Sequence, residues 1–248
     1  VAIYSRSFDV DAEEGQKLIL HFDGIESCGE IYVNGVFAGY TEGSFTPAEF
    51  DITELVKNGV NQLVVKVLRW CDGSWLEDQD FFRLAGIFRD VYLYALPEAH
   101  ISDFRVDALL DENYQDGRLK VEVFTEEAAE GCEVRLDLYS PKGRGILSTE
   151  VAQVKDGRVE FEEEVETPWQ WSAESPSLYT VVLTLAAGDE ETILACRCGF
   201  RTFELKDGLM MLNNRRIVFK GANRHEFGAG FGRAITKEAM LQDVRDMK

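Results

Sequence analysis

Short runs in which apolar and polar residues alternate recur along most of the chain. Such alternation predicts β-strands with one buried face. Before Pro97, runs of this kind cover residues 17–22, 30–33, 36–40, 61–68 and 88–94, after an alternating start at residues 4–8. Asn34 and Gly35 lie between two runs and tolerate the positive φ that a two-residue hairpin turn requires. The one helical candidate is short, near residues 52–56. This pattern predicts a sandwich or barrel over residues 1–97.

A second set of strand patterns follows Pro97. The runs cover residues 100–108, 118–125, 133–139, 159–165, 179–185 and 192–200, with Gly and Asp clustered between them. About 100 residues with roughly seven short strands predict an immunoglobulin-like sandwich, here over residues 98–202. The Cys–Trp–Cys spacing of true immunoglobulin domains is absent, so the prediction concerns the architecture alone.

The pattern changes again at Phe203. Residues 209–212 and 216–220 flank two asparagines and predict a β-hairpin, which a glycine-bearing loop follows. Thr236 can cap a helix whose apolar face contains Met240, Val244 and Met247 at positions i, i+4 and i+7. This is one βα unit, whereas a parallel (β/α)8 barrel needs about 200 residues. We therefore expect residues 203–248 to begin a barrel domain, and the start without Met to be a cut upstream of a strand.

The charge excludes some classes of partner. The 248 residues include 45 Asp and Glu against 26 Lys and Arg, which gives a formal net charge of −19. Such a surface repels phosphate, so neither a nucleic acid nor a membrane surface is expected as a partner. No apolar run approaches the ~20 residues that a membrane span needs, and no basic-then-apolar leader is visible.

The chain has an odd number of cysteines. These are Cys28, Cys71, Cys132, Cys196 and Cys198. An odd number in a chain of this length fits a secreted disulfide framework badly. Cys196 and Cys198 would point the same way on a strand, but two thiols alone are a weak metal signal. We expect reduced thiols in a cytoplasmic protein.

Four stretches of the sequence carry a resemblance to a known family. The most specific is residues 69–93, with the sequence RWCDGSWLEDQDFFRLAGIFRDVYL. It closely resembles the family 2 glycoside hydrolases, the large bacterial β-galactosidases in particular. Residues 22–53, 171–183 and 219–248 resemble, in order, further parts of the same enzymes. The resemblance thus covers nearly the whole chain.

The resemblance implies an all-β fold with three parts. These are a jelly-roll sugar-binding domain at residues 1–97, an immunoglobulin-like sandwich at 98–202, and the truncated first βα unit of a TIM barrel at 203–248. It implies that the parent enzyme hydrolyses terminal β-galactosides with retention, which needs two carboxylates about 5–5.5 Å apart. In this family both glutamates lie on later barrel strands, so the fragment itself is expected to be inactive. The resemblance also implies Na⁺ and Mg²⁺ as cofactors and a homo-oligomeric parent enzyme.

One acidic loop is a candidate sugar or cation site. Glu77, Asp78 and Asp80 lie within five residues, and clustered carboxylates can accept hydrogen bonds from sugar hydroxyls or coordinate a hard cation. From spacing alone, a solvated acidic loop is the simpler interpretation. The resemblance favours Asp80, because the matching aspartate in β-galactosidases reaches into the galactose site and helps to hold a sodium ion.

Two further sets of residues have open interpretations. Arg224 and His225 follow a predicted barrel strand at its carboxyl end, where loop residues are often functional, and could line a sugar pocket with Glu226 orienting them. The alternative is a hydrogen-bonded cluster that fixes the first barrel loop. Trp70 and Trp75 could stack on a sugar, or they could serve core or interface packing.

The leading hypothesis is therefore the N-terminal part of a cytoplasmic β-galactosidase. A carbohydrate-binding module without catalysis and a purely structural scaffold are the alternatives from other classes. Among enzymes, β-glucuronidases and β-mannosidases share the layout, and the sequence DGSWLEDQD favours a galactosidase.

Overall fold

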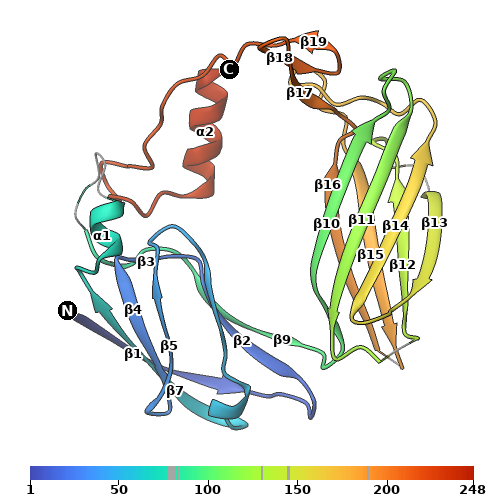
Figure 1. Cartoon of the computed structure of the whole chain (residues 1–248). Coiled ribbons are helices and arrows are strands. Elements are labelled where there is room, and N and C mark those ends of the chain that lie inside the picture. Colours follow the sequence, from blue (N-terminus) through green and yellow to red (C-terminus); the bar gives the residue numbers. More distant parts are fainter. Residues whose placement is uncertain (78–81, 83, 130, 144–145, 189) are drawn as a thin grey trace. The chain divides into compact units, whose positions relative to one another are not determined.

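The computed structural model describes residues 1–77, 82, 84–129, 131–143, 146–188 and 190–248. The chain forms two compact units, one made of residues 1–96 with 222–248 and the other of residues 97–221. Nearly all regular structure is β-strand, as predicted (Figure 1). The predicted domain boundary at residue 203 falls inside the second unit.

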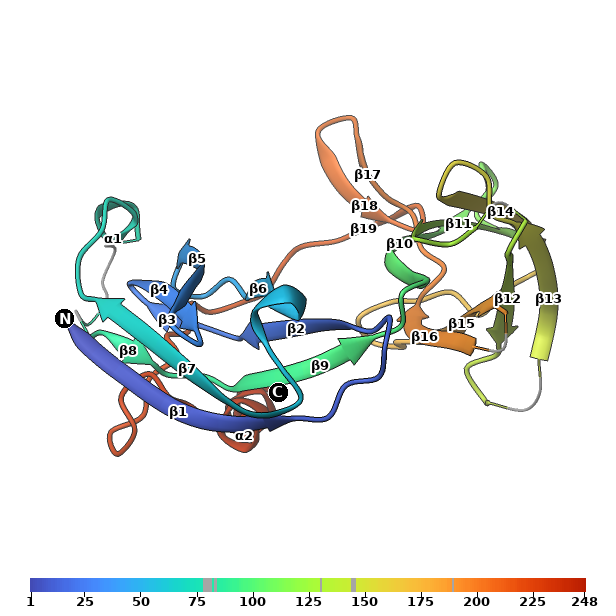
Figure 2. The same cartoon turned by 90° about the horizontal axis from the view of Figure 1, so that it is seen from below.

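The first unit is a sandwich of antiparallel sheets. One sheet has the order β1-β7-β4-β5, the other has the order β6-β2-β9, and β3 pairs with β8. Their bounds are β1 Ala2–Val10, β2 Lys17–Phe22, β3 Ile25–Glu26, β4 Cys28–Val33, β5 Val36–Glu42, β6 Ala48–Asp51, β7 Gly59–Leu68, β8 Gly86–Ile87 and β9 Val91–Leu96. Inward-facing side chains such as Phe22, Ile31 and Val65 are fully or almost fully buried and form its core. Figure 2 shows β1, β7, β2 and β9 of this unit from below.

Local signals in this unit behave as predicted, with one exception. Asn34 and Gly35 both have positive φ, 51° and 83°, and close the hairpin between β4 and β5. A 3-10 helix at Thr53–Leu55 lies within the predicted helical candidate. The exception is α1, Gly73–Leu76, a single turn without a side-chain cap, which no periodic pattern could have revealed.

The second unit is a two-sheet, immunoglobulin-like sandwich. Its sheets have the orders β10-β11-β14 and β13-β12-β15-β16. The strands are β10 His100–Leu110, β11 Gly117–Glu126, β12 Glu133–Tyr139, β13 Ile146–Gln153, β14 Arg158–Val165, β15 Tyr179–Ala187 and β16 Glu190–Cys198. Leu119, Val121, Leu136, Val181 and Phe200 belong to its buried core. The predicted strands are all present, and β13 is an additional strand at a sheet edge.

A small sheet and a helix complete the chain. β17 (Phe203–Lys206), β18 (Leu209–Leu212) and β19 (Arg215–Arg216) form an antiparallel sheet, so the predicted hairpin is confirmed. Its second strand is shorter than predicted and ends at Arg216, because β18 pairs with residues 215 and 216 only. Residues 217–227 therefore lack the barrel strand that was expected before Arg224. The helix α2 (Lys237–Met247) starts at Thr236, whose side chain accepts a hydrogen bond from the amide of Ala239.

All five cysteines are free; Cys28 is buried and the others are half-buried. Burial raises the pKa of the Cys28 thiol to about 11. No helix among the described residues combines the length and the apolar character that a membrane crossing requires.

Candidate functional site

A buried ion pair joins the C-terminal loop to the jelly-roll sandwich. Arg233 Nη1 donates to Glu26 Oε1 at 2.6 Å, and the two side chains are 5% and 9% exposed. Burial raises the pKa of Glu26, and the Arg233 guanidinium only partly offsets that shift. The same guanidinium lies 5.0 Å from the centre of the Phe45 ring. The loop at residues 222–236 is thus held against strand β3.

Arg89 forms a second connection between the same segments. Its Nη2 donates to Glu226 Oε2 at 3.2 Å, and its Nη1 donates to the backbone carbonyls of Asp23 and Phe45. Nearby, the rings of Phe82 and Phe227 stack with centres 4.7 Å apart. One charged and one aromatic contact therefore reinforce the link made by Arg233.

A small cavity lies beside this junction. Its volume is about 20 Å³, and its lining residues include Glu26, Phe45, Trp70, Glu77 and Arg233. That volume holds about one water molecule and is too small for a sugar ring. The Glu77 carboxylate accepts hydrogen bonds from the Ser44 amide at 2.8 Å and from its hydroxyl at 2.7 Å. Glu77 thus fixes the backbone at the cavity.

Of the three predicted sugar-binding residues, the structure describes Arg224 and His225. Asp80 lies outside the described residues. Arg224 Nε donates to Asp243 Oδ2 of α2 at 2.7 Å, whereas the neighbouring His225 is exposed. Glu226 is engaged by Arg89, as described above. Neither Arg224 nor His225 lines the small cavity or the groove described next.

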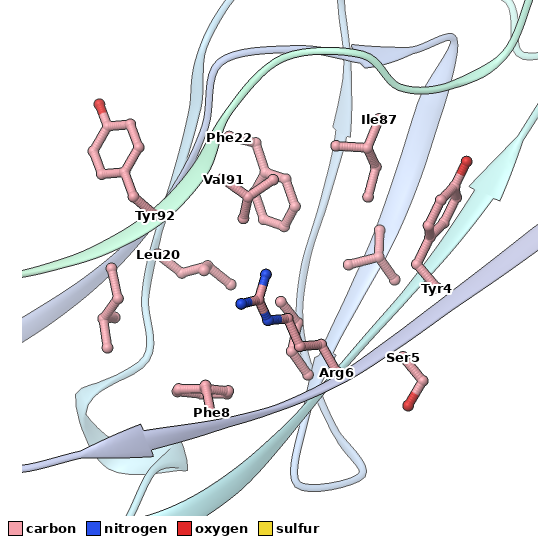
Figure 3. A pocket seen from close by; sticks show the side chains of 12 residues that line it. Tyr4, Ser5, Arg6, Phe8, Leu20, Phe22, Ile87, Val91 and Tyr92 are labelled. Carbon is pink, nitrogen blue, oxygen red and sulfur yellow. The ribbon is translucent and has the colours of Figure 1, made fainter.

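A wide groove lies between the two sheets of this unit. Figure 3 shows its side chains, with the Arg6 guanidinium directed into it. The groove has a volume of about 510 Å³ and is lined by Tyr4, Ser5, Arg6 and Phe8 of β1, Leu20 and Phe22 of β2, Leu63 and Val65 of β7, Ile87 of β8, and Val91, Tyr92 and Leu93 of β9. We call it the β1–β9 groove. Its lining is mainly apolar and offers few hydroxyl-binding groups for a sugar.

Two exposed indoles lie near the small cavity. The rings of Trp70 and Trp75 stack with centres 6.0 Å apart and planes 18° apart. Their exposed fractions are 49% and 70%, so neither is a core residue. The guanidinium of Arg69 lies 5.2 Å from the Trp70 ring centre. The pair forms a surface on which a sugar or another protein segment could pack.

Sequence comparisons identify the family. The sugar-binding domain of glycosyl hydrolases family 2 matches residues 1–97, a second domain with the same family name matches residues 99–201, and the family's TIM barrel domain matches residues 203–248. The chain belongs to glycosyl hydrolases family 2.

Related proteins of known name are bacterial glycosidases. A β-galactosidase of Priestia megaterium is 46% identical over 260 residues, covering 100% of the chain and 25% of that relative. A β-galactosidase of Streptococcus thermophilus is 43% identical over 251 residues, covering 100% and 24%. The chain thus spans about a quarter of the length of the curated relatives it matches.

Solved structures with the same fold include β-glucuronidases. That of Parabacteroides merdae has a TM-score of 0.87 at 25% identity, covering 99% of the chain and 33% of that protein. That of Bacteroides uniformis has a TM-score of 0.85 at 26% identity, covering 99% and 32%. The chain therefore shares its fold with these β-glucuronidases.

Metal ligands are sparse among the described residues of this family 2 chain. Glu42, Cys71 and Asp72 each offer a ligand atom, and these atoms lie within 4.8 Å of one another. The carboxylates suit a hard cation such as Mg²⁺, but the thiol suits Zn²⁺ better. The donor set is mixed and does not match an all-oxygen Mg²⁺ site. The Na⁺ expected at Asp80 involves a residue outside those described.

Sequence reasoning missed the residues that fix the C-terminal loop. Glu26, Arg89 and Arg233 carry the two charged contacts, yet none was a candidate. Glu26 and Arg233 are 207 residues apart. No periodicity or motif within one sequence connects such distant positions.

Proposed function

We propose that the chain is the N-terminal part of a retaining β-galactosidase that hydrolyses terminal non-reducing β-D-galactosides. The observation that carries the proposal is the 46% identity to a β-galactosidase along 100% of the chain. The match of three consecutive family 2 domains in order supports it.

In the parent enzyme, this part has a positioning role. The contacts of Arg233 with Glu26 and of Glu226 with Arg89 hold the loop that precedes α2 against the sandwich. That loop carries Arg224 and His225, which we propose contact the sugar together with Asp80 from the jelly-roll domain. The two carboxylates that retaining hydrolysis requires belong to the rest of the parent polypeptide. Residues 1–248 alone are accordingly expected to be inactive.

The reaction is tested on the parent polypeptide with chromogenic β-galactoside, β-glucuronide and β-mannoside. The expected result is hydrolysis of the galactoside at least about 100-fold faster, by kcat/KM, than of the other two, a preference worth about 2.7 kcal/mol. A preference for the glucuronide would instead support the alternative suggested by the β-glucuronidase structures. A parent that cleaves none of the three would contradict the proposal.

A binding module without chemistry is the second candidate function, and the exposed pair Trp70 and Trp75 favours it. Calorimetry of the 248-residue chain with galactose and lactose tests it. Millimolar or tighter binding that Asp80→Ala abolishes, and that Asp11→Ala leaves unchanged, would show sugar binding without the barrel. Undetectable binding would contradict the binding module and would favour a purely structural role of the chain in the enzyme.

The remaining features of the parent enzyme follow from the same proposal. We propose that it is cytoplasmic, and its free thiols support this. We also propose a homo-oligomer and bound Na⁺ and Mg²⁺. Sedimentation of the parent polypeptide and metal analysis of the purified protein test these points.

A further inference from the structure

The two cysteines of the first unit lie next to each other. Cys28 begins β4 and pairs with Leu68 of β7, three residues before Cys71. The Cys28 thiol donates to the backbone carbonyl of Leu68 at 3.8 Å, and the Cys71 thiol donates to the backbone carbonyl of Ser27 at 3.9 Å. Each thiol thus reaches the backbone of the segment that carries the other, and the two side chains are in hydrogen-bonding contact.

The backbone is held in place at both cysteines. Cys28 is paired on both sides, with Leu68 of β7 and with Glu42 of β5. The Cys71 amide donates to Ser74 Oγ at 3.0 Å, and the Ser74 amide donates to the Cys71 carbonyl at 3.2 Å, at the start of α1. A disulfide forms only when its two residues are close and suitably oriented, so two fixed, neighbouring cysteines favour it. The thiol contacts that would be given up are weak, because S–H is a poor donor.

The two thiols differ in their access to solvent. Cys28 is 0% exposed, whereas Cys71 is half-buried. A small reagent in solution therefore reaches Cys71 first, and Cys28 is placed to react with whatever is attached to Cys71. The other three cysteines, Cys132, Cys196 and Cys198, belong to the second unit. Within the first unit, only one pairing of cysteines is possible.

We propose that Cys28 and Cys71 are a modification site, at which a small-molecule disulfide oxidises them to a reversible intramolecular disulfide. The Cys71 thiolate attacks one sulfur of the small disulfide, whose S–S bond breaks, and one small thiol leaves. Cys28 then loses its proton and attacks the Cys71 sulfur of the mixed disulfide, and the second small thiol leaves. The protein gives up two hydrogen atoms, and the small disulfide is reduced to two thiols.

An excess of small thiol reverses both steps, because each is a thiol–disulfide exchange. Disulfides inside cells are usually transient and redox-sensing, so a reversible bond is consistent with the free thiols of the chain. The inference goes beyond the proposed function and does not depend on it.

The bond would join two walls of the small cavity beside the junction. Glu26 and Ser27, which precede Cys28, line one wall, and Trp70 and Ser74, on either side of Cys71, line another. Ser27 Oγ already donates to the Arg69 carbonyl at 2.9 Å between these walls. A covalent link at this place restricts the unfolded chain and stabilises the first unit.

Incubation of the 248-residue chain with glutathione disulfide tests the proposal. The number of thiols that react after denaturation should fall from five to three, and peptide mapping should find Cys28 linked to Cys71. The unfolding midpoint of the first unit should rise by at least about 5 °C, and dithiothreitol should return it to its first value. Five remaining thiols in an excess of glutathione disulfide would overturn the proposal.

Variants of the two cysteines separate the two steps. Cys28→Ala removes the second thiol, so glutathione should stay attached to Cys71. Cys71→Ser, at a half-buried position, should leave Cys28 reduced and the midpoint insensitive to the oxidant. The control is Cys132→Ser, a half-buried cysteine of the second unit, and it should still form the link. A glutathione adduct that persists on Cys71 while Cys28 is present would overturn the proposal.

A disulfide between two copies of the chain is the competing product. Electrophoresis without reductant distinguishes the two, and a monomer that contains the internal link is expected at every protein concentration. A dimer joined through Cys71, with Cys28 still reduced, would contradict the intramolecular bond.

Discussion

The Glu26 carboxylate and the Arg233 guanidinium form a buried ion pair at 2.6 Å, although 207 residues separate them in the sequence. This contact closes the first unit, because it ties a loop at the end of the chain to strand β3 near its beginning. The pKa of Glu26 is nevertheless raised, because burial disfavours its charged form more than Arg233 favours it. The pair thus fixes the position of the loop against the sandwich.

Replacing one residue of this pair is expected to lower the free energy of unfolding much more than replacing both. Arg233→Met or Glu26→Gln leaves a buried group without its partner, which costs about 3–5 kcal/mol in the free energy of unfolding of the first unit. The double variant should cost clearly less than the sum of the two. Denaturant unfolding of the four proteins measures this double-mutant cycle. Arg245→Met, at an exposed position of α2, is the control, and additive effects would contradict the coupling.

His21 makes the stability of the same unit depend on pH. Its Nδ1 lies 2.8 Å from Glu49 and its Nε2 lies 2.8 Å from Asp23, while its ring stacks on Tyr92. Burial lowers the pKa of His21, but the hydrogen bonds to the two carboxylates outweigh it, so its pKa is raised above 6.5. The folded state therefore binds the proton more tightly than the unfolded state does.

It follows that His21 stabilises the fold fully below about pH 6.5 and loses this contribution as pH rises through its folded pKa. Unfolding free energies measured between about pH 6 and pH 8.5 should fall with pH in the native sequence, and the slope should be smaller in His21→Gln. His225→Gln changes an exposed histidine and serves as the control. An unchanged slope in His21→Gln would rule out His21 as the source of this pH dependence.

Sequence patterns identified the strands well, for a physical reason. A strand with one buried face must alternate, so β2 and β12 could be predicted with their bounds. Positive-φ turns and helix caps are equally local, which is why the hairpin at Asn34 and the cap at Thr236 were predictable. β13 escaped prediction because its polar Ser, Thr, Glu and Gln residues, at a sheet edge, show no clear apolar face.

The candidate site was less predictable, because its contacts are not local. Arg224 and His225 are neighbours in the sequence, but one is engaged by Asp243 and the other is exposed. The contacts that position the loop depend on Glu26 and Arg89, which only the folded sandwich brings near it. A local pattern can suggest which residues bind sugar, but it does not show which residues hold them in place.

The cap of α2 is expected to control the order of the last helix. The Thr236 hydroxyl accepts a hydrogen bond from the Ala239 amide at 3.2 Å, and no residue of α2 is buried. Because packing adds little, the cap is a large part of the stability of this helix. Thr236→Ala should lower the stability of helix α2 by about 1 kcal/mol and speed amide exchange within it. Thr236→Ser keeps the hydroxyl acceptor and should have neither effect. Equal exchange in the two variants would contradict this.

Gly117 is expected to be essential for packing in the immunoglobulin-like unit. A Cβ at this position would lie 2.6 and 2.7 Å from two carbons of the Phe200 ring and 2.9 Å from Pro168 Cγ. Phe200 is fully buried and packs edge-to-face on Tyr179, so it cannot move aside easily. Gly117→Ala should therefore lower the free energy of unfolding of this unit by about 1–3 kcal/mol, through overpacking.

Two variants separate this steric effect from a backbone effect. Gly117→Ala combined with Phe200→Leu should lose less stability than the two single changes summed, because the smaller side chain makes room for the new methyl group. Gly221→Ala, where an added Cβ meets nothing within 4 Å, should leave the unfolding midpoint of this unit nearly unchanged. Thermal or denaturant unfolding, followed by near-ultraviolet dichroism, measures the native chain, the two single variants, their combination and Gly221→Ala. If Gly117→Ala were as harmless as Gly221→Ala, the close approach of Phe200 would not be what requires glycine on β11.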